Sequence, residues 1–243
     1  MANLSPNKGA RFRAWTMLAA GLLLTPMISV ASSTPAPFTY EYGFTGSKIP
    51  FTIKATRTLK QVGPNKWQTQ LGAKNILGEI TETSFFSWQG CTPVASDYKN
   101  FRKGLGQTRE SHLVLNHTAD NPTATLYRGG EKNREFAITA NATDMLSLPL
   151  AIQCQLQQDP RKKMSFEVAS ERRHETLDFI IKGTQKVTTP AGEFSTIRIE
   201  RDRGKDAKRN TIMWFSTDHN YALVKMIQED DSSSYEMNIR SFK

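Results

Sequence analysis

Alternation of apolar and polar positions is the commonest pattern along this chain. In residues 51–59, Phe51, Ile53, Ala55 and Leu59 fall on one parity, while threonine and lysine dominate the other. Successive side chains of an extended strand point to opposite faces, so this period of two predicts a strand with one buried face. Similar runs recur between clusters of Gly, Pro, Asn and Asp, which indicates antiparallel hairpins.

The C-terminal part shows the pattern most clearly. Residues 211–216, 221–228 and 235–242 are three such runs joined by short polar turns, which predicts a meander of three antiparallel strands. The first run, TIMWFS, is apolar on both parities, as is typical of a strand that is covered on both sides or lines an apolar cavity. Other predicted strands cover residues 66–75, 78–88, 109–117, 124–130 and 135–140, with more from Met164 on.

The stretch TTPAGEFSTIRIERDR, residues 188–203, combines a turn with an alternating run. Pro190 presets the first dihedral angle of a turn, and Gly192 adopts a positive φ easily. Ile197 and Ile199 then alternate with charged residues. The stretch therefore predicts the bend and second strand of a hairpin, not a catalytic loop.

Residues 142–158 depart from the alternation and predict the one short helix. Their apolar residues recur at helical offsets, and Asn141 or Thr143 can cap the start with Asp144 in the first turn. Pro149 is expected to end or kink this helix, because proline lacks the backbone N–H that a helix interior needs.

These elements predict a mainly β fold, with antiparallel strands forming a curved sheet or open barrel that one short helix crosses. The 243 residues, 38% of them apolar, suffice for a single domain, which we place at residues 32–243. Closing or covering the sheet protects its edges and leaves a concave apolar face.

Residues 1–31 carry the features of a secretory signal peptide. Lys8, Arg11 and Arg13 precede an apolar core, and small residues follow it. The core is short and is interrupted by Pro26, so it makes a poor membrane span, although an uncleaved anchor is the alternative. We expect cleavage to leave a soluble protein of the periplasm with no transmembrane segment.

The chain is basic, with a formal net charge of +9, to which the predicted signal peptide contributes three cations and no acid. A positive charge favours association with anions, here a lipid or another anionic envelope component. The basic runs at residues 161–163 and 201–209 are the natural contacts, although Gly204 and the interspersed acids make the second run typical of a solvated hairpin tip. Because the chain is predicted to be exported, we predict no nucleic acid partner.

Cys91 and Cys154 are the two cysteines of the chain. An oxidising compartment permits a disulfide between them, which would stabilise the fold by roughly 4 kcal/mol through the loop it closes. Two buried free thiols are the alternative, because spacing along the chain does not show proximity. No pattern of metal ligands or cofactor-binding motif is present.

Candidate catalytic residues are few. Ser96 and Lys99 match the S-x-x-K pattern, in which a lysine activates a serine one helical turn away, but Ser5 and Lys8 match it too. His112 is the other candidate base. The spacing of the four histidines, His112, His117, His174 and His219, does not match a metal-ligand pattern. Residues 103–109 hold only the first two glycines of a dinucleotide-binding loop. We therefore predict no enzyme and no catalytic residue.

Several motifs together resemble an exported bacterial family known as domain of unknown function 3108. They are the turn T-P-A-G-x-F at residues 189–194, the aliphatic and charged run at 197–201, the aromatic strand and D-x-N-Y at 214–221 and the basic-small-aromatic end at 240–242. Similar positions in the N-terminal part extend the resemblance over nearly the whole exported chain. It implies a periplasmic protein rich in antiparallel strands and lends no activity. The cysteine pair is not part of this pattern.

Three functional hypotheses remain. The first is a non-catalytic periplasmic protein that binds an apolar or amphipathic, lipid-like envelope ligand, with its basic hairpin tips facing an anionic surface. The second is an envelope hydrolase using Ser96 with Lys99, or His112. The third is a structural scaffold for another envelope protein.

Overall fold

The computed structural model describes residues 34–76, 78–104, 106–118, 120–204 and 207–243. The predicted signal peptide at residues 1–31 lies outside them and stays a prediction, as does the single-domain boundary drawn from it. The elements of the described part are β1 (Phe38–Gly46), β2 (Ile49–Gly63), β3 (Lys66–Asn75), β4 (Gly78–Gln89), β5 (Thr92–Gly104), β6 (Gln107–Asn116), β7 (Thr123–Arg128), β8 (Glu131–Ala137), β9 (Thr143–Asp144), α1 (Leu148–Gln158), β10 (Met164–Ala169), β11 (His174–Thr189), β12 (Gly192–Asp202), β13 (Arg209–Ser216), β14 (Ala222–Asp230) and β15 (Ser233–Phe242).

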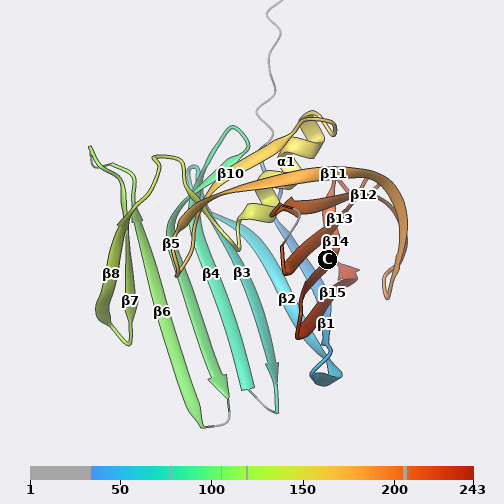
Figure 1. Cartoon of the computed structure of the whole chain (residues 1–243), viewed down its shortest axis with the longest axis horizontal. Helices are drawn as coiled ribbons and strands as arrows, with labels where there is room; N and C mark the ends of the chain where they lie inside the picture. The colour runs from blue at the N-terminus through green and yellow to red at the C-terminus, as the bar shows by residue number, and fades with distance from the viewer. Residues whose placement is uncertain (1–33, 77, 105, 119, 205–206) are drawn as a thin grey trace, which may run out of the picture. The chain divides into compact units, whose positions relative to one another are not determined.

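These strands form a single open sheet in the order β8-β7-β6-β5-β4-β3-β2-β1-β15-β14-β13-β12-β11-β10-β9. Neighbours are antiparallel throughout, except for the short parallel pair of β9 and β10. Consecutive hairpins build both halves of the sheet, and β1 joins them by pairing with β15, with Tyr42 opposite Ile239 (Figure 1). The predicted class, a mainly antiparallel curved sheet with one helix, is confirmed.

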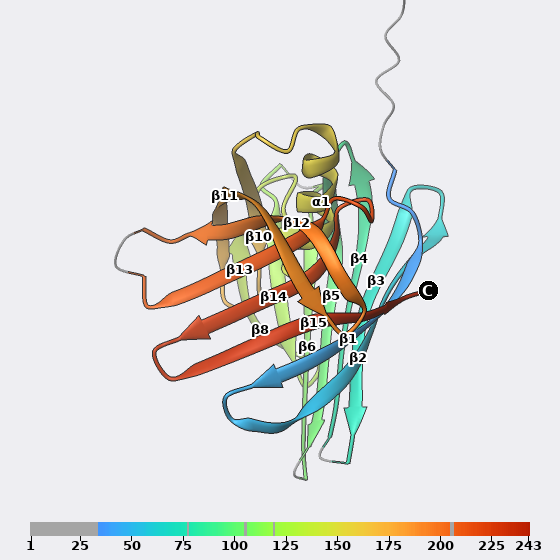
Figure 2. The same ribbon diagram turned by 90° about the vertical axis from the view of Figure 1, so that its right-hand side faces the viewer.

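The sheet curls until its far end meets β5. The backbone N–H of Ala95 on β5 donates to the carbonyl of Ala142, just before β9, at 3.1 Å. At the same place Ala169 of β10 packs with Ala95 and Leu113 in one apolar cluster. The two halves of the sheet therefore face each other, with α1 between them at one end (Figures 1 and 2).

Helix α1 fills that end of the curled sheet with apolar side chains on two sides. Ile152 and Leu156 pack into the large cluster of β10–β15, whereas Leu150 and Cys154 pack against Trp67 and its neighbours on β2–β4. We call the sheet face that packs on α1 the inner face. Burial on both sides of the helix explains why residues 142–158 show no clean amphipathic stripe.

The predicted start of the helix was wrong. α1 begins at Leu148, after the N-cap Ser147, and Pro149 lies in its first turn instead of ending it. Proline is tolerated there because the first N–H groups of a helix have no intrahelical acceptor. Thr143 and Asp144 form β9, so they do not cap the helix.

The predicted C-terminal meander is present as β13, β14 and β15. Its two-sided apolar strand is covered on both faces. Met213 and Phe215 are buried, and Trp214 is buried on the opposite face, where its Nε1 donates to Gln185 at 3.2 Å. Cationic side chains lie over the indole ring, so charged residues supply the outer cover of this strand.

The turn between β11 and β12 depends on Gly192. Its φ is +129°, a conformation that side-chain-bearing residues rarely adopt, and nothing lies within 4 Å of the Cβ position. We expect Gly192→Val to lower the free energy of unfolding by about 1–3 kcal/mol through backbone strain alone. Urea unfolding of a purified chain comprising residues 32–243 measures this.

Gly72 on β3 is the matched control. It also has nothing within 4 Å of its Cβ position, but its φ lies outside the positive range. Gly72→Val should therefore leave the free energy of unfolding unchanged or raise it, because valine favours strands. Equal effects of the two substitutions would show that φ at residue 192 does not matter.

Candidate functional site

A buried carboxylate, Asp144, anchors the loop that leads into α1. Its side chain is 1% exposed. Oδ1 accepts the backbone N–H groups of Leu146 (2.8 Å) and Ser147 (3.0 Å), and Oδ2 accepts the hydroxyls of Ser147 (2.9 Å) and Ser84. Burial raises the pKa of Asp144, and these hydrogen bonds oppose the rise.

Arg57 is a buried cation beside this loop. It is 5% exposed, and its Nη2 donates to the carbonyl of Leu146 at 2.8 Å. Burial lowers its pKa, while the neighbouring Tyr42, Tyr40 and Asp144 raise it. Arg57 from β2 and Asp144 at the end of β9 thus both hold the turn at residues 145–147.

Glu82 and Tyr98 extend this polar group along the inner face. Burial raises the pKa of Glu82, against the lowering effect of Arg102, whose Nη2 lies 3.4 Å from the carboxylate. Tyr98 hydrogen-bonds Glu82, and burial followed by the charges of Glu82 and Asp144 raises the pKa of its hydroxyl. Perturbed titratable groups of this kind mark candidate functional sites, although structural networks produce them too.

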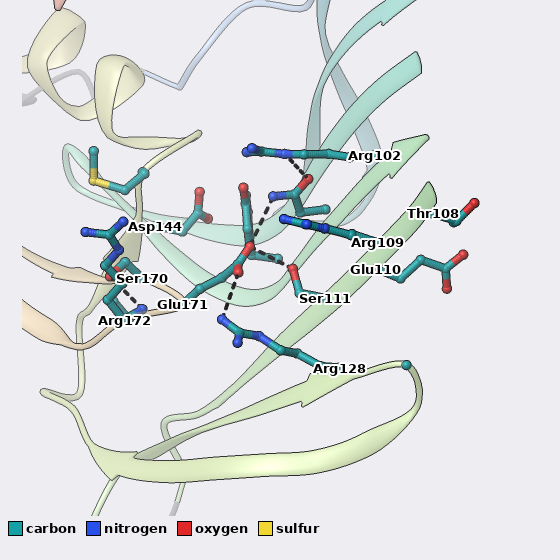
Figure 3. A pocket seen from close by; sticks show the side chains of 15 residues that line it. Arg102, Thr108, Arg109, Glu110, Ser111, Arg128, Asp144, Ser170, Glu171 and Arg172 are labelled. Carbon is teal, nitrogen blue, oxygen red and sulfur yellow. Dashed lines mark hydrogen bonds and ion pairs between the residues drawn. The ribbon is translucent and has the colours of Figure 1, made fainter. Parts of the chain in front are cut away.

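Next to these groups lies hollow I, a cavity of about 790 Å³ between the β10–β11 corner and the inner faces of β5, β6 and β7 (Figure 3). Glu171 reaches across from the corner and accepts from Asn100 Nδ2 (3.1 Å) and Ser111 Oγ (2.7 Å). Arg128 lies 3.7 Å from the same carboxylate. The lining includes Tyr98, Arg102, Arg109, Arg128, Asp144, Met145, Ser170, Glu171 and Arg172.

Two further cavities adjoin hollow I. Hollow II, of about 350 Å³, shares Met145, Ser170 and Arg172 with it and extends under β11–β14. Hollow III, of about 470 Å³, shares Arg102 and Arg109 and runs toward the tips of the β1–β2 and β3–β4 hairpins. The three hollows lie next to one another along the inner face, and we call this row of neighbouring hollows the path.

Large apolar side chains on this path are exposed to solvent. They are Phe51 (40%) and Ile80 (41%) in hollow III and Met145 (47%) between hollows I and II. The exposure of Phe51 and Ile80 is unusual because these strand residues belong to the face that elsewhere forms the core, and Met145 adds to it from the turn before α1. A partly uncovered inner face edged by arginines suits a molecule that is apolar in one part and anionic in another.

The structure does not bring the candidate nucleophile and its lysine together in the required way. Ser96 and Lys99 lie on the extended strand β5, where three residues span about 10 Å, not on one helical turn. Ser96 Oγ donates to the carbonyl of Phe85 at 3.2 Å, and Lys99 lies over the ring of Phe85.

The four histidines lie apart from one another. His112 Nε2 is 2.8 Å from Asp97 Oδ1 on the outer face, and His117 Nε2 is 2.6 Å from the carbonyl of Ala95. His174 pairs with Glu167, and His219 stacks on Phe242. Within the described ranges, no three His, Cys, Asp or Glu residues are arranged to hold a metal ion.

Cys91 and Cys154 lie together in the structure, with Cα atoms 5.4 Å apart and a bond between their sulfurs. The pair connects the β4–β5 turn to α1. We propose that this disulfide forms in the exported protein.

The sequence pattern alone did not reveal Arg57 or the role of Asp144 as parts of a site. A signal existed for the first, because Arg57 occupies the same parity as Ala55 and Leu59, and a charge on an apolar parity indicates a buried ion. For Asp144 the apolar run that follows it suggested a helix start. The arginines of the hollows come from separate segments, and only the curl of the sheet gathers them.

The family model for "Protein of unknown function (DUF3108)" matches residues 46–240. The chain belongs to this family. The match confirms the resemblance seen in the motifs at residues 189–194 and 214–221. No functionally curated protein matches the chain.

One solved structure supports the fold, and a second shows a weaker similarity. A crystal structure from Brucella abortus, named as a beta-barrel-like protein of domain of unknown function DUF1849, is similar over 85% of this chain and 97% of its own, with 11% identity and a TM-score of 0.58. A proposed lipoprotein from Parabacteroides distasonis is similar over 86% and 96%, with 15% identity and a TM-score of 0.32. In the part of the chain that the structure covers, no helix has the length and apolar character needed to cross a membrane.

Proposed function

We propose that this protein binds an apolar or amphipathic, lipid-like molecule of the cell envelope along the inner face of its sheet, without catalysing a reaction on it. The observation that carries the proposal is the exposure of Phe51, Ile80 and Met145 in the neighbouring hollows I–III. The predicted signal peptide at residues 1–31 supports the periplasm as the proposed place of this binding.

Energetics favour a ligand for this face. Burying apolar area stabilises a complex by about 25 cal/mol per Å², so covering several large side chains supplies a useful driving force. The inner face of an antiparallel sheet is otherwise the side that a protein buries. Arginines along the same path keep it wet at its edges and contact the polar end of a ligand.

A neutral apolar probe tests the proposal. N-phenyl-1-naphthylamine should bind the purified exported chain with a rise in fluorescence, and Ile80→Glu should weaken this binding by about tenfold or more, because a carboxylate in the apolar lining is costly to desolvate. Native mass spectrometry of gently purified protein should show a co-purified lipid in the wild type.

Ile180 gives a matched control. It is also 41% exposed but lies on the opposite parity of β11 from the buried Phe179, outside the three hollows. Ile180→Glu should therefore leave probe binding unchanged. Absence of probe binding together with absence of any co-purified lipid would refute the proposal, and equal losses in both variants would refute its location.

A further inference from the structure

Hollow II contains an excess of positive charge. Five arginines line it, from the β10–β11 corner, the end of β12 and the start of β13: Arg172, Arg173, Arg201, Arg203 and Arg209. In the described part of the chain, ion pairs connect this group to two carboxylates, those of Glu175 and Asp230. The excess comes from three segments that the fold brings to one cavity.

Both carboxylates already have partners within the protein. Glu175 accepts from Arg173 Nη2 at 2.9 Å and from Arg201 Nη2 at 3.0 Å. Burial alone would raise the pKa of Glu175, but these two arginines outweigh it and hold the pKa below its ordinary value. Asp230 lies 3.6 Å from Arg209 and also accepts hydrogen bonds within its own turn.

Arg203 and Arg172 are the arginines of the cluster that form no ion pair with a carboxylate of the described residues. The Nε of Arg203 is buried and has no hydrogen-bond partner in that part of the chain. Burial, followed by the charges of Arg201 and Arg209, lowers the pKa of Arg203. A partly desolvated cation among like charges costs stability unless an anion neutralises it.

Apolar side chains lie beside these cations. Met213 and Met226 come from β13 and β14, Leu177 and Phe179 from β11, and all four line hollow II. Met145 then connects hollow II to hollow I. The cavity therefore presents guanidinium groups and an apolar wall within one small volume, the arrangement that an anionic headgroup attached to an acyl chain requires.

We infer that hollow II is a subsite for an anionic headgroup, a phosphate or carboxylate, which Arg172 and Arg203 bind while the attached apolar chain passes Met145 toward hollow I. This inference rests on the proposed function and adds the polar end of the ligand. Arginine suits this role because its planar fork donates two hydrogen bonds to the oxygens of phosphate or carboxylate.

Three probes separate the headgroup from the chain: decyl phosphate, decanol and inorganic phosphate, each titrated by calorimetry at one fixed ionic strength. The test variant is Arg172→Gln with Arg203→Gln in the full exported chain. The control is Arg161→Gln, an arginine whose side chain is 91% exposed and lies outside hollows I–III.

We expect wild-type protein to bind decyl phosphate at least tenfold more tightly than decanol. The double variant should lose about tenfold to hundredfold in decyl phosphate affinity, the range expected for one or two charge-assisted hydrogen bonds, and keep its decanol affinity. Arg161→Gln should change neither. Equal wild-type affinities for decyl phosphate and decanol, or an unchanged double variant, would overturn the inference.

Two of these comparisons distinguish a free anion from a lipid headgroup and separate the proposed lipid-like ligand from the anion subsite. Inorganic phosphate binding as tightly as decyl phosphate, and lost in the double variant, would support the anion subsite while refuting the lipid-like ligand. Decanol binding without any preference for decyl phosphate would support the proposed function while refuting the subsite.

Thermal melting guards against a variant that fails for structural reasons. In phosphate-free buffer the double variant should melt at or above the wild-type temperature, because it removes like charges that repel one another. Millimolar decyl phosphate should raise the melting temperature of the wild type only. A double variant that melts well below the wild type in the absence of ligand would show that these arginines are structural and would overturn the assignment.

Discussion

Replacing Asp144 with alanine is expected to lower the free energy of unfolding by about 3–5 kcal/mol, the cost of breaking a buried charged network by removing one partner. The substitution leaves two backbone N–H groups and two hydroxyls without their acceptor, and it leaves the buried Arg57 without its nearby anion. Chemical unfolding of a purified chain comprising residues 32–243 gives this free energy directly.

Asp144→Asn separates the hydrogen bonds from the charge. The amide oxygen can still accept from the backbone N–H groups of Leu146 and Ser147, and the amide nitrogen can donate to the hydroxyls of Ser84 and Ser147. We therefore expect a smaller loss for Asn than for Ala. An Ala variant as stable as the wild type would show that Asp144 does not hold the loop into α1.

The pH dependence of unfolding, compared between the wild type and Asp144→Asn, isolates the titration of Asp144. Its pKa in the fold lies above the ordinary value of 3.8, because burial outweighs its hydrogen bonds. The native state therefore binds more protons at Asp144 than the unfolded chain does, from about pH 4 up to the raised pKa. The contribution of Asp144 to the free energy of unfolding consequently falls as pH rises through that window. The wild type minus Asp144→Asn difference should fall in the same direction, and a difference that rises with pH would contradict it.

Local patterns predicted the strands because each hairpin here is built from consecutive residues. Residues 211–242 alternate, turn and alternate again, and β13, β14 and β15 follow them closely. The turn at residues 189–192 forms as its Pro and Gly indicate. The prediction of where the helix starts was wrong because Pro149 fits the first turn of a helix as well as its end.

The candidate site could not be predicted to the same degree, because it depends on how the sheet curls. Hollow II collects residues from near 172, 201 and 209, which no local pattern connects. The run at residues 201–209 suggested a solvated hairpin tip. Its alternation nevertheless held a clue, since Arg201 and Arg203 share one parity and Asp202 falls on the other.

The sequence could not show whether Cys91 and Cys154 form a disulfide. Removing this bond is the second large effect on stability that we expect. The bond spans 63 positions in the chain, and a loop of that length stabilises a fold by about 4 kcal/mol through the restriction of the unfolded state. Cys91→Ala with Cys154→Ala should therefore lower the free energy of unfolding by about 4 kcal/mol. Urea unfolding measures it, and an intact mass lower by two hydrogen atoms shows the bond in the wild type.

Dithiothreitol supplies the control for this prediction. It should bring the wild type close to the double variant and leave the double variant unchanged, since only the wild type has a bond to reduce. Cys154 is 2% exposed and packs among Trp67, Phe86 and Trp88. Any difference in the free energy of unfolding that remains between the reduced wild type and the double variant therefore reflects the poorer packing of the shorter alanine side chains. A wild type whose unfolding does not respond to the reductant, and whose mass shows two thiols, would mean that α1 is held to the β4–β5 turn by packing alone.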